Sequence, residues 1–275
     1  MESRASRISA TMATTSFSAR DRIVSLAPSV TSILLALGAG RELVGVSKWC
    51  KDVADVGQRP QVGDCWKMNI EEVMLLKPTI LIGSVPFAPD TVAKLLAQPI
   101  TFVAINPRSL ADVDRDIRIL GRIVNRGPHA EKLIRRMKQT FDTVAKAARA
   151  KNAGKRPRVY CEAWPKPRIS SPPWVAELVA IAGGQMVVTP GQRVTDKEVA
   201  AAKPDIIVLA WAATGNTAKP ASALGNLAWQ NVPAVKKRRV FVIRDELLNT
   251  PGPPLMKGAA ELLRIIQEGS AKDSK

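Results

Sequence analysis

The chain has 275 residues, of which 46% are hydrophobic and 24% charged, and this composition favours a soluble globular protein over a disordered or membrane protein. Its 41 basic and 24 acidic residues give a net charge of +17, which favours anionic partners such as nucleic acid, acidic lipid or a phosphate- or carboxylate-bearing ligand. The basic residues are spread along the chain, so nucleic acid is the least favoured of these partners.

The cysteines and the histidine limit the metal chemistry that this chain could support. Cys50, Cys65 and Cys161 make an odd number without CxxC spacing, and His129 is the single histidine, so the sequence indicates neither a metal site nor a disulfide framework. Cys50 and Cys65 could pair if their loops meet, but we favour free, partly buried thiols. His129 is expected at the surface, at the start of a long helix, rather than as a general base.

Residues 1–20 contain arginines and many small residues, without the uninterrupted apolar core of a secretory signal. We expect them to form a disordered leader, and we therefore expect a cytoplasmic protein. A periplasmic location is the alternative if the true start differs or a signal was removed. The apolar segment after Ile23 is broken by Pro28 and is too short for a transmembrane helix.

Strands and helices alternate in the first half of the chain, which is typical of parallel βα units. A strand at 23–26 leads through a loop at 27–29 to a helix at 31–37. Asn69 and Glu72 have the spacing of a capping box at the start of another helix, which Pro78 ends. Further strands are expected at 43–46, 80–82 and 100–105, and further helices at 90–96 and 110–124.

A long amphipathic helix is predicted at 129–151, after a break at Gly127 and Pro128. It contains no glycine or proline and would span about 30 Å, so we expect a rigid connector between two α/β lobes, each with a central, mainly parallel sheet. The predicted organisation is a leader at 1–20, an N-terminal lobe at 21–127, an interlobe helix at 128–153, a C-terminal lobe at 154–268 and a tail at 269–275.

The second half of the chain repeats the plan of the first. Residues 69–82 align without gaps with residues 195–208, and Thr195 and Glu198 form a second expected capping box. The remaining elements expected here are a strand at 159–161, a loop at 162–173, a helix at 174–182, a strand at 240–243 and a closing helix at 258–268.

Tryptophans and polar residues follow the expected strands, at the edge of a parallel sheet where ligands bind. An indole on a loop offers a large apolar face and an N–H donor. We expect Trp174 and Trp229 to be core residues instead. The residues expected to contact a ligand are Pro28, Ser29, Trp49, Trp66, Ser84, Trp164, Lys166, Trp211 and Asp245.

Catalytic motifs are absent from the sequence, which has no GxSxG, Walker loop or GxGxxG. Glu162 and Asp245 could face each other across a cleft as a carboxylate pair, but without another activated group we expect them to hydrogen-bond to a ligand. We therefore predict a binding protein with no catalytic residues and no required cofactor. A nucleic-acid binder would require affinity that falls steeply with salt.

Several stretches carry a resemblance to a known family: SLAPSVTSILLALGAGRELVGVS, the Trp66-x-Met-Asn-x-Glu segment before LLKPTILIG, the long helix, VYCEAW followed by WVAELVAIAGG, and PGP near the end. Over about residues 21–268 the chain resembles the helical-backbone class of substrate-binding proteins, which serve cobalamin and iron-siderophore ABC importers. The resemblance is strongest to the cobalamin-binding branch. It implies two α/β lobes joined by one rigid helix, with a small hinge motion.

The resemblance also implies a ligand and a partner. The ligand would be cobalamin or a related tetrapyrrole held between the lobes of a monomer, with Trp49 and Trp66 packed on the corrin. An iron-siderophore or haem is the alternative ligand. An enzyme acting on a corrinoid or nucleotide is the alternative of another class, with Glu162, Lys166 and Asp245 as acid and base.

Proteins of this family dock on an ABC permease through one carboxylate in each lobe. Glu71 stands at the first-lobe position, but Lys197 stands at the equivalent position of the second lobe and reverses the charge. We therefore expect either an importer component that has lost one docking carboxylate or a relative that binds its ligand without a transporter.

Overall fold

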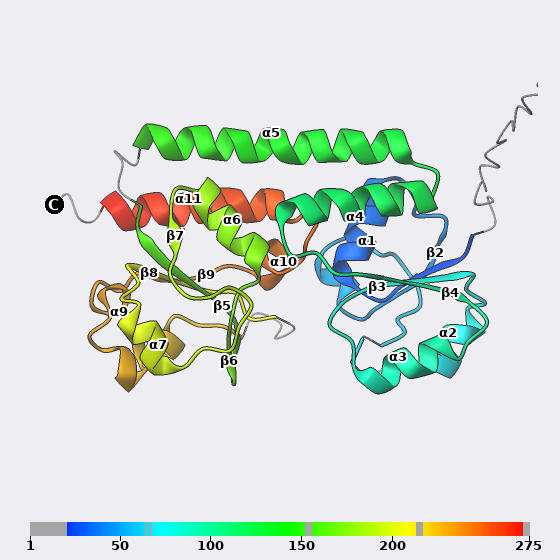
Figure 1. The fold of residues 1–275 in the computed structure, drawn as a ribbon, viewed down its shortest axis with the longest axis horizontal. Coiled ribbons are helices and arrows are strands. Elements are labelled where there is room, and N and C mark those ends of the chain that lie inside the picture. The colour runs from blue at the N-terminus through cyan, green and yellow to red at the C-terminus, as the bar shows by residue number, and fades with distance from the viewer. Residues whose placement is uncertain (1–20, 64, 67, 152–155, 213–216, 272–275) are drawn as a thin grey trace, which may run out of the picture.

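A computed structural model describes residues 21–63, 65–66, 68–151, 156–212 and 217–271, which form two α/β lobes side by side (Figure 1). The expected leader at 1–20 lies outside the described residues. In both lobes, helices cover the two faces of a central sheet, as expected from the alternation of strands and helices in the sequence.

The N-terminal lobe has a four-stranded parallel sheet in the order β2-β1-β3-β4. Helices α1 and α4 cover one face and α2 and α3 the other (Figure 1). β1 and most of β3 are buried, which explains their continuous apolar sequence. The elements are β1 (Ile23–Ser25), α1 (Pro28–Ala36), β2 (Leu43–Val46), the 3-10 turn η1 (Cys50–Asp52), α2 (Ile70–Leu75), β3 (Ile80–Ser84), α3 (Pro89–Leu96), β4 (Thr101–Ile105) and α4 (Leu110–Ile123).

The C-terminal lobe has a sheet in the order β6-β5-β8-β9, with β7 also paired to β5. β6 is antiparallel to β5, and the other pairs are parallel. The elements are β5 (Arg158–Pro165), β6 (Arg168–Ser170), α6 (Pro173–Ile181), β7 (Gln185–Met186), α7 (Asp196–Ala201), β8 (Ile206–Leu209), α8 (Ala221–Leu224), the 3-10 turn η2 (Leu227–Trp229), α9 (Pro233–Lys236), β9 (Val240–Val242), α10 (Asp245–Leu248) and α11 (Leu255–Ala271).

Helix α5 (Gly127–Lys151) runs along both lobes and packs on α4, α6 and α11 (Figure 1). Its inward side chains join one hydrophobic core that contains residues of both lobes, among them Ile33 of α1, Leu120 of α4 and Leu262 of α11. The predicted connecting helix is therefore present, and the lobes share buried apolar surface beneath it.

The repeated segment folds in the same way in both lobes. α2 and α7 each end before a lysine in the left-handed region, Lys77 with φ 47° and Lys203 with φ 43°, and a proline follows each of them. Thr195 and Glu198 form the predicted capping box of α7. In α2 the box is incomplete, because Glu72 accepts a hydrogen bond from the side-chain amide of Asn69 rather than from its backbone N–H.

Several boundaries differ from the prediction. The first helix begins at Pro28, because a proline in the first helical turn needs no N–H partner, so Pro28 and Ser29 are helical rather than in a loop. Gly127 and Pro128 begin α5 for the same reason, rather than only breaking the helix before it. The segment expected to be a loop at 162–173 instead continues β5 and turns into β6, and the closing helix runs to Ala271.

Among the described residues, no helix is both long enough and apolar enough to cross a membrane.

Candidate functional site

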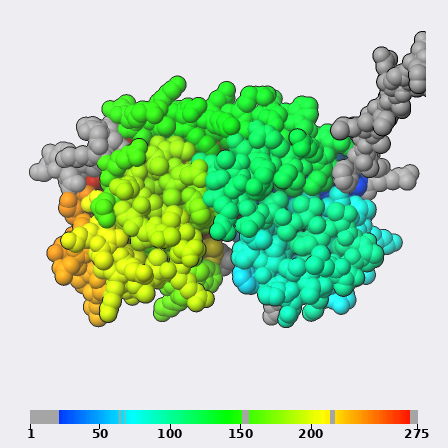
Figure 2. Space-filling view, viewed as in Figure 1, coloured from blue at the N-terminus to red at the C-terminus, as the bar shows by residue number. Residues whose placement is uncertain are grey.

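A cleft of about 280 Å³ lies between the two lobes, just below the range of about 300–1,000 Å³ typical of ligand pockets. The space-filling view shows a notch between the lobes that opens on the side away from α5 (Figure 2). The cleft is lined by the start of α1, the loops after β2 and β3, the start of α6 and the segment from α10 to Pro251. Of the residues predicted to contact a ligand, it collects Pro28, Ser29, Trp49, Trp66, Ser84 and Asp245.

Three tryptophans line this cleft. The side chain of Trp66 is 63% exposed, and Trp49 is half-buried with the Lys48 ammonium 4.9 Å from its ring centroid. Trp174 is buried as expected, and its Nε1–H donates to the Leu248 carbonyl oxygen at 2.9 Å. Two of the three indoles are thus accessible to a flat ligand, and the third forms a fixed part of the wall.

The polar side of the cleft comes from α10 and the residues next to it. Arg244 forms an ion pair with the buried Glu246, and its Nη2 also donates to the backbone oxygen of Asp52 in the other lobe at 3.4 Å. Asn249 donates through Nδ2 to the Ala210 oxygen at 2.6 Å, while its buried Oδ1 has no partner among the described residues. Arg244 therefore offers a cation to an anionic group, while the Asn249 side chain is held in the wall by its bond to Ala210.

Sequence reasoning missed Glu246, Asn249 and Cys65 as residues of the cleft. The available signal was the end of β9 at Val242, since Arg244 and Asp245 come two and three residues later. The short helix α10 was not predicted, and it is this helix that turns Glu246 and Asn249 back toward the cleft.

All three cysteines are free in the structure, as we favoured. Cys65 lies at the cleft wall, where its thiol donates to the Leu26 carbonyl oxygen at 3.1 Å. Cys50 lies under α1 with Thr31 Oγ1 3.0 Å from its sulfur, and burial raises the pKa of its thiol. Cys161 is buried in β5, and desolvation raises its pKa to about 12.

The other predicted ligand residues, Trp164, Lys166 and Trp211, line a separate pocket of about 460 Å³ within the C-terminal lobe. Trp164 lies at the end of β5, and its indole N–H donates to the Lys166 carbonyl oxygen at 2.9 Å. Trp211 follows β8, one residue before the cleft residue Ala212. The residues predicted to form one site are therefore divided between two neighbouring pockets.

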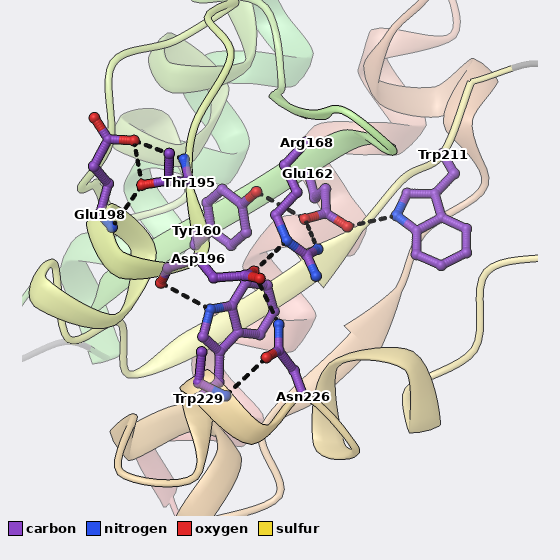
Figure 3. Close-up of polar contacts among 10 residues, drawn as sticks. Tyr160, Glu162, Arg168, Thr195, Asp196, Glu198, Trp211, Asn226 and Trp229 are labelled. Carbon is purple, nitrogen blue, oxygen red and sulfur yellow. Dashed lines mark hydrogen bonds and ion pairs between the residues drawn. The ribbon is translucent and has the colours of Figure 1, made fainter.

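A buried carboxylate, that of Glu162, organises the second pocket (Figure 3). Its Oε1 accepts from Trp211 Nε1 at 2.8 Å, and its Oε2 accepts from Tyr160 Oη at 2.8 Å and from Arg168 Nη1 at 2.6 Å. Arg168 also donates to Asp196 at the start of α7, at 2.6 Å. Burial and the neighbouring Glu162 carboxylate both raise the pKa of the Tyr160 phenol, which holds its proton on the hydrogen bond to Glu162.

The structure does not bring Glu162 and Asp245 together as a carboxylate pair. Glu162 lines the second pocket, and both of its oxygens are occupied by Trp211, Tyr160 and Arg168, whereas Asp245 lines the interlobe cleft. His129 lies at the start of α5, far along the chain from the strand ends, as expected. Within the described residues there is no group of three or more His, Cys, Asp or Glu side chains that could hold a metal ion.

The two residues at the expected docking positions are exposed near the starts of α2 and α7, on the side opposite α5 (Figure 1). Glu71 occupies the first turn of α2. Lys197 lies between two acidic residues that are already engaged, because Asp196 binds Arg168 and Asn226 and Glu198 closes the cap on Thr195. The two positions therefore differ in charge, although the exposed Glu198 carboxylate follows Lys197 directly in the sequence.

Comparison with known proteins gives one family match: the model of the periplasmic binding protein family matches residues 23–247. An uncharacterised ABC transporter substrate-binding lipoprotein of Bacillus subtilis is 27% identical over 92% of this chain and 82% of its own length. The vitamin B12-binding protein of Vibrio cholerae is 25% identical over 90% of this chain and 91% of its own length. A periplasmic heme-binding protein from Pseudomonas aeruginosa has a structure with a TM-score of 0.80 and 23% identity, over 90% of this chain and 93% of its own.

Proposed function

The chain belongs to the periplasmic binding protein family, and from this membership we propose that it binds a cobalamin-like corrinoid in the cleft between its two lobes. At the coarser level it is a substrate-binding protein of the cobalamin, haem or siderophore type, in a family of ligand-binding transport proteins rather than enzymes. The observation that carries the corrinoid proposal is the pairing of Trp49 and Trp66 at a cleft whose described lining contains no His, Tyr or Met.

The residues around the cleft favour a corrinoid over haem. Haem iron is held in proteins by His, Tyr, Met or Cys side chains. Among the described residues that line the cleft there is no His, Tyr or Met, and the one sulfur ligand, Cys65, donates its proton to a backbone oxygen. Cobalamin carries its own axial ligands, so a wall of indoles with a few polar groups is sufficient to bind it.

Haem or an iron-siderophore is the second candidate, and Arg244 is the observation that favours it. The Arg244 side chain is 58% exposed at the cleft, and a guanidinium there would pair with the carboxylates of a haem or an anionic siderophore. The heme-binding protein from Pseudomonas aeruginosa shows that this fold accommodates haem in another protein.

Titration of the purified protein separates these ligands. Cyanocobalamin, its biosynthetic precursors and haem would each be added while the visible absorbance and the heat of binding are recorded. We expect saturable binding of a corrinoid and weaker binding of haem. Tight binding of haem, with no absorbance change or heat on addition of any corrinoid, would identify haem as the ligand. If neither class gives an absorbance change or heat, both are excluded.

Single alanine substitutions test the cleft directly. Trp49→Ala and Trp66→Ala should each weaken corrinoid binding by at least about tenfold, because a central aromatic contact contributes on the order of 2 kcal/mol. Leu227→Ala is the matched control, since Leu227 is 88% exposed and lies outside both pockets. If both tryptophan variants keep their affinity for the corrinoid but lose thermal stability, the two tryptophans stabilise the fold and do not contact the ligand.

For location and partner, we propose a periplasmic or surface-anchored protein that delivers its ligand to an ABC permease. The relatives favour this alternative over the cytoplasmic expectation, because one is named a lipoprotein and the heme-binding protein from Pseudomonas aeruginosa is named periplasmic. Lys197 makes the docking surface asymmetric, so Lys197→Glu should strengthen corrinoid-dependent binding to a permease reconstituted in nanodiscs. Weaker binding of this variant would contradict the docking role of that position.

A further inference from the structure

The outer side of α5 carries a row of exposed cations. The inward side of the helix is apolar, with Ala130, Leu133, Met137 and Val144 buried in the shared core. Residues that are three or four positions apart lie on the same face of a helix, and the cations opposite the core follow this spacing. We call the five exposed cations on that side the basic face: Lys132, Arg135, Arg136, Lys146 and Arg149.

The ion pairs described for α5 use other residues. Glu131 binds Arg118, and Lys138 binds Asp114, both across the packed interface with α4. Within the described part of the chain, none of the five residues of the basic face takes part in an ion pair. Asp142 is exposed on α5, and the Glu131 side chain is 45% exposed and interacts electrostatically with Arg135, but the five cations outnumber these two carboxylates, so the outer side keeps a positive charge.

The shape of this surface is long and convex. α5 has 25 residues, which corresponds to about 37 Å, and it crosses both lobes on the side opposite the notch (Figures 1 and 2). None of the large hydrophobic side chains exposed on the described residues belongs to α5. The described part of α5 therefore offers charge along a straight line, without an exposed Phe, Tyr or Trp side chain.

We propose that the basic face binds the surface of an anionic phospholipid bilayer. A planar anionic surface can contact all five cations at once, and each cation near such a surface adds to the attraction. Nucleic-acid binding is less suited to this helix, since it generally uses a groove, an inserted helix or aromatic side chains that stack on bases. A protein bound in this way has its notch and the starts of α2 and α7 facing away from the bilayer, so binding to lipid through α5 and docking on a permease are two alternative states.

The test compares two variants with the same total charge. One replaces the five residues of the basic face by glutamine, and the control replaces five exposed basic residues on other surfaces by glutamine. Glutamine keeps helix propensity close to that of lysine and arginine. The control residues are Lys94, Arg108, Arg193, Lys219 and Lys236.

Binding would be measured by co-sedimentation with vesicles that contain phosphatidylglycerol and with vesicles of phosphatidylcholine alone. We expect the unmodified protein to bind only the anionic vesicles, with an affinity that falls as salt is added. The basic-face variant should bind at least about tenfold more weakly, and the control variant within about threefold of the unmodified protein.

Equal losses in the two variants would overturn the proposal, because total charge alone would then explain the binding. It would also be overturned if the basic-face variant kept its vesicle binding but lost binding to duplex DNA, which would make nucleic acid the partner. Circular dichroism and ligand titration of both variants report whether they are folded. Vesicle binding is read separately from ligand binding, so failure of the corrinoid assignment leaves this result interpretable.

Discussion

Glu162 is a heavily bonded side chain of the C-terminal lobe. It accepts hydrogen bonds from Trp211, Tyr160 and Arg168 while being fully buried. A buried carboxylate in this position is tolerated because each oxygen has a partner, and removing its charge leaves the Arg168 guanidinium without its inner partner. Its role is therefore to fix the wall of the second pocket.

Glu162→Gln should lower the free energy of unfolding by about 3 kcal/mol, because one member of a buried ion pair is neutralised. Urea denaturation followed by fluorescence measures this change. Glu261→Gln is the control, since Glu261 pairs with Arg264 on the exposed side of α11, where such pairs contribute at most about 1 kcal/mol. Similar losses in the two variants would contradict the structural importance of Glu162.

The three thiols should differ in reactivity. The pKa of Cys161, raised to about 12, leaves roughly 1 in 10⁴ molecules as thiolate at pH 8, and the residue is also buried. Cys65 lies at the cleft wall, so iodoacetamide should modify Cys65 first, and a bound corrinoid should slow that reaction. Mass spectrometry of timed samples gives the order. Modification of Cys161 before Cys65 in native protein would contradict this placement.

At the scale of elements, the cap of α7 is the clearest local stabiliser. The Thr195 Oγ1 accepts from the Glu198 backbone N–H at 3.2 Å, and the Glu198 carboxylate accepts from the Thr195 N–H at 2.6 Å. Thr195→Ala should lower the free energy of unfolding by about 1 kcal/mol. Urea denaturation checks this value. A loss below the error of that measurement would show that packing alone holds α7.

The cap of α7 should also make the stability of the protein depend on pH. Hydrogen bonds from Thr195 hold the pKa of Glu198 below its ordinary value, so the folded protein favours the ionised form. The stabilisation is present above the unfolded pKa of about 4.3 and is lost as the pH falls through the lower folded pKa. The stability difference between the unmodified protein and Glu198→Gln should therefore narrow in acid. A difference that widens in acid would contradict this sign.

Elements with local signals were predictable from the sequence, and elements formed by distant pairing were not. The capped helix and strand at 195–208 were found because cap, apolar period and proline all lie within one short segment. β6 was missed because its three residues become a strand only by pairing with β5, and Trp- and Pro-rich sequence favours a loop. α10 was missed because four residues carry too little periodicity to indicate a helix.

Part of the candidate site was also predictable from the sequence. Strand ends pointed to Trp49, Ser84 and Asp245, which do line the interlobe cleft. The sequence could not show that Trp164 and Trp211 line a different pocket, because that division depends on the β5–β6 hairpin and on the hydrogen bond from Trp211 to Glu162. Whether any of these residues contacts a ligand stays a prediction.

At the scale of the whole molecule, the two lobes share one hydrophobic core beneath α5. A hydrogen bond from the Leu110 N–H to the Glu177 carboxylate, at 3.1 Å, also links α4 of one lobe to α6 of the other. Because this buried surface is common to both lobes, the lobes should not unfold independently. This coupling agrees with the small hinge motion that the resemblance implied.

Leu120→Ala in α4 and Leu262→Ala in α11 test the coupling, since both side chains are fully buried in the shared core. Each variant should lose about 2–5 kcal/mol and keep a single unfolding transition. Differential scanning calorimetry and fluorescence should report the same midpoint for each variant. Two resolved transitions, with only one of them shifted in each variant, would show that the lobes are independent.

The shared core also has a kinetic consequence. A receptor that closes by large domain rotation captures its ligand in two steps, and the slower conformational step sets an upper limit on the observed rate. In this molecule α5 and the core beneath it hold the two walls of the cleft close to one relative position. Stopped-flow traces should then show a single phase whose rate rises linearly with ligand concentration, so the residence time of the ligand is set by its contacts with the indoles and not by the reopening of a lid.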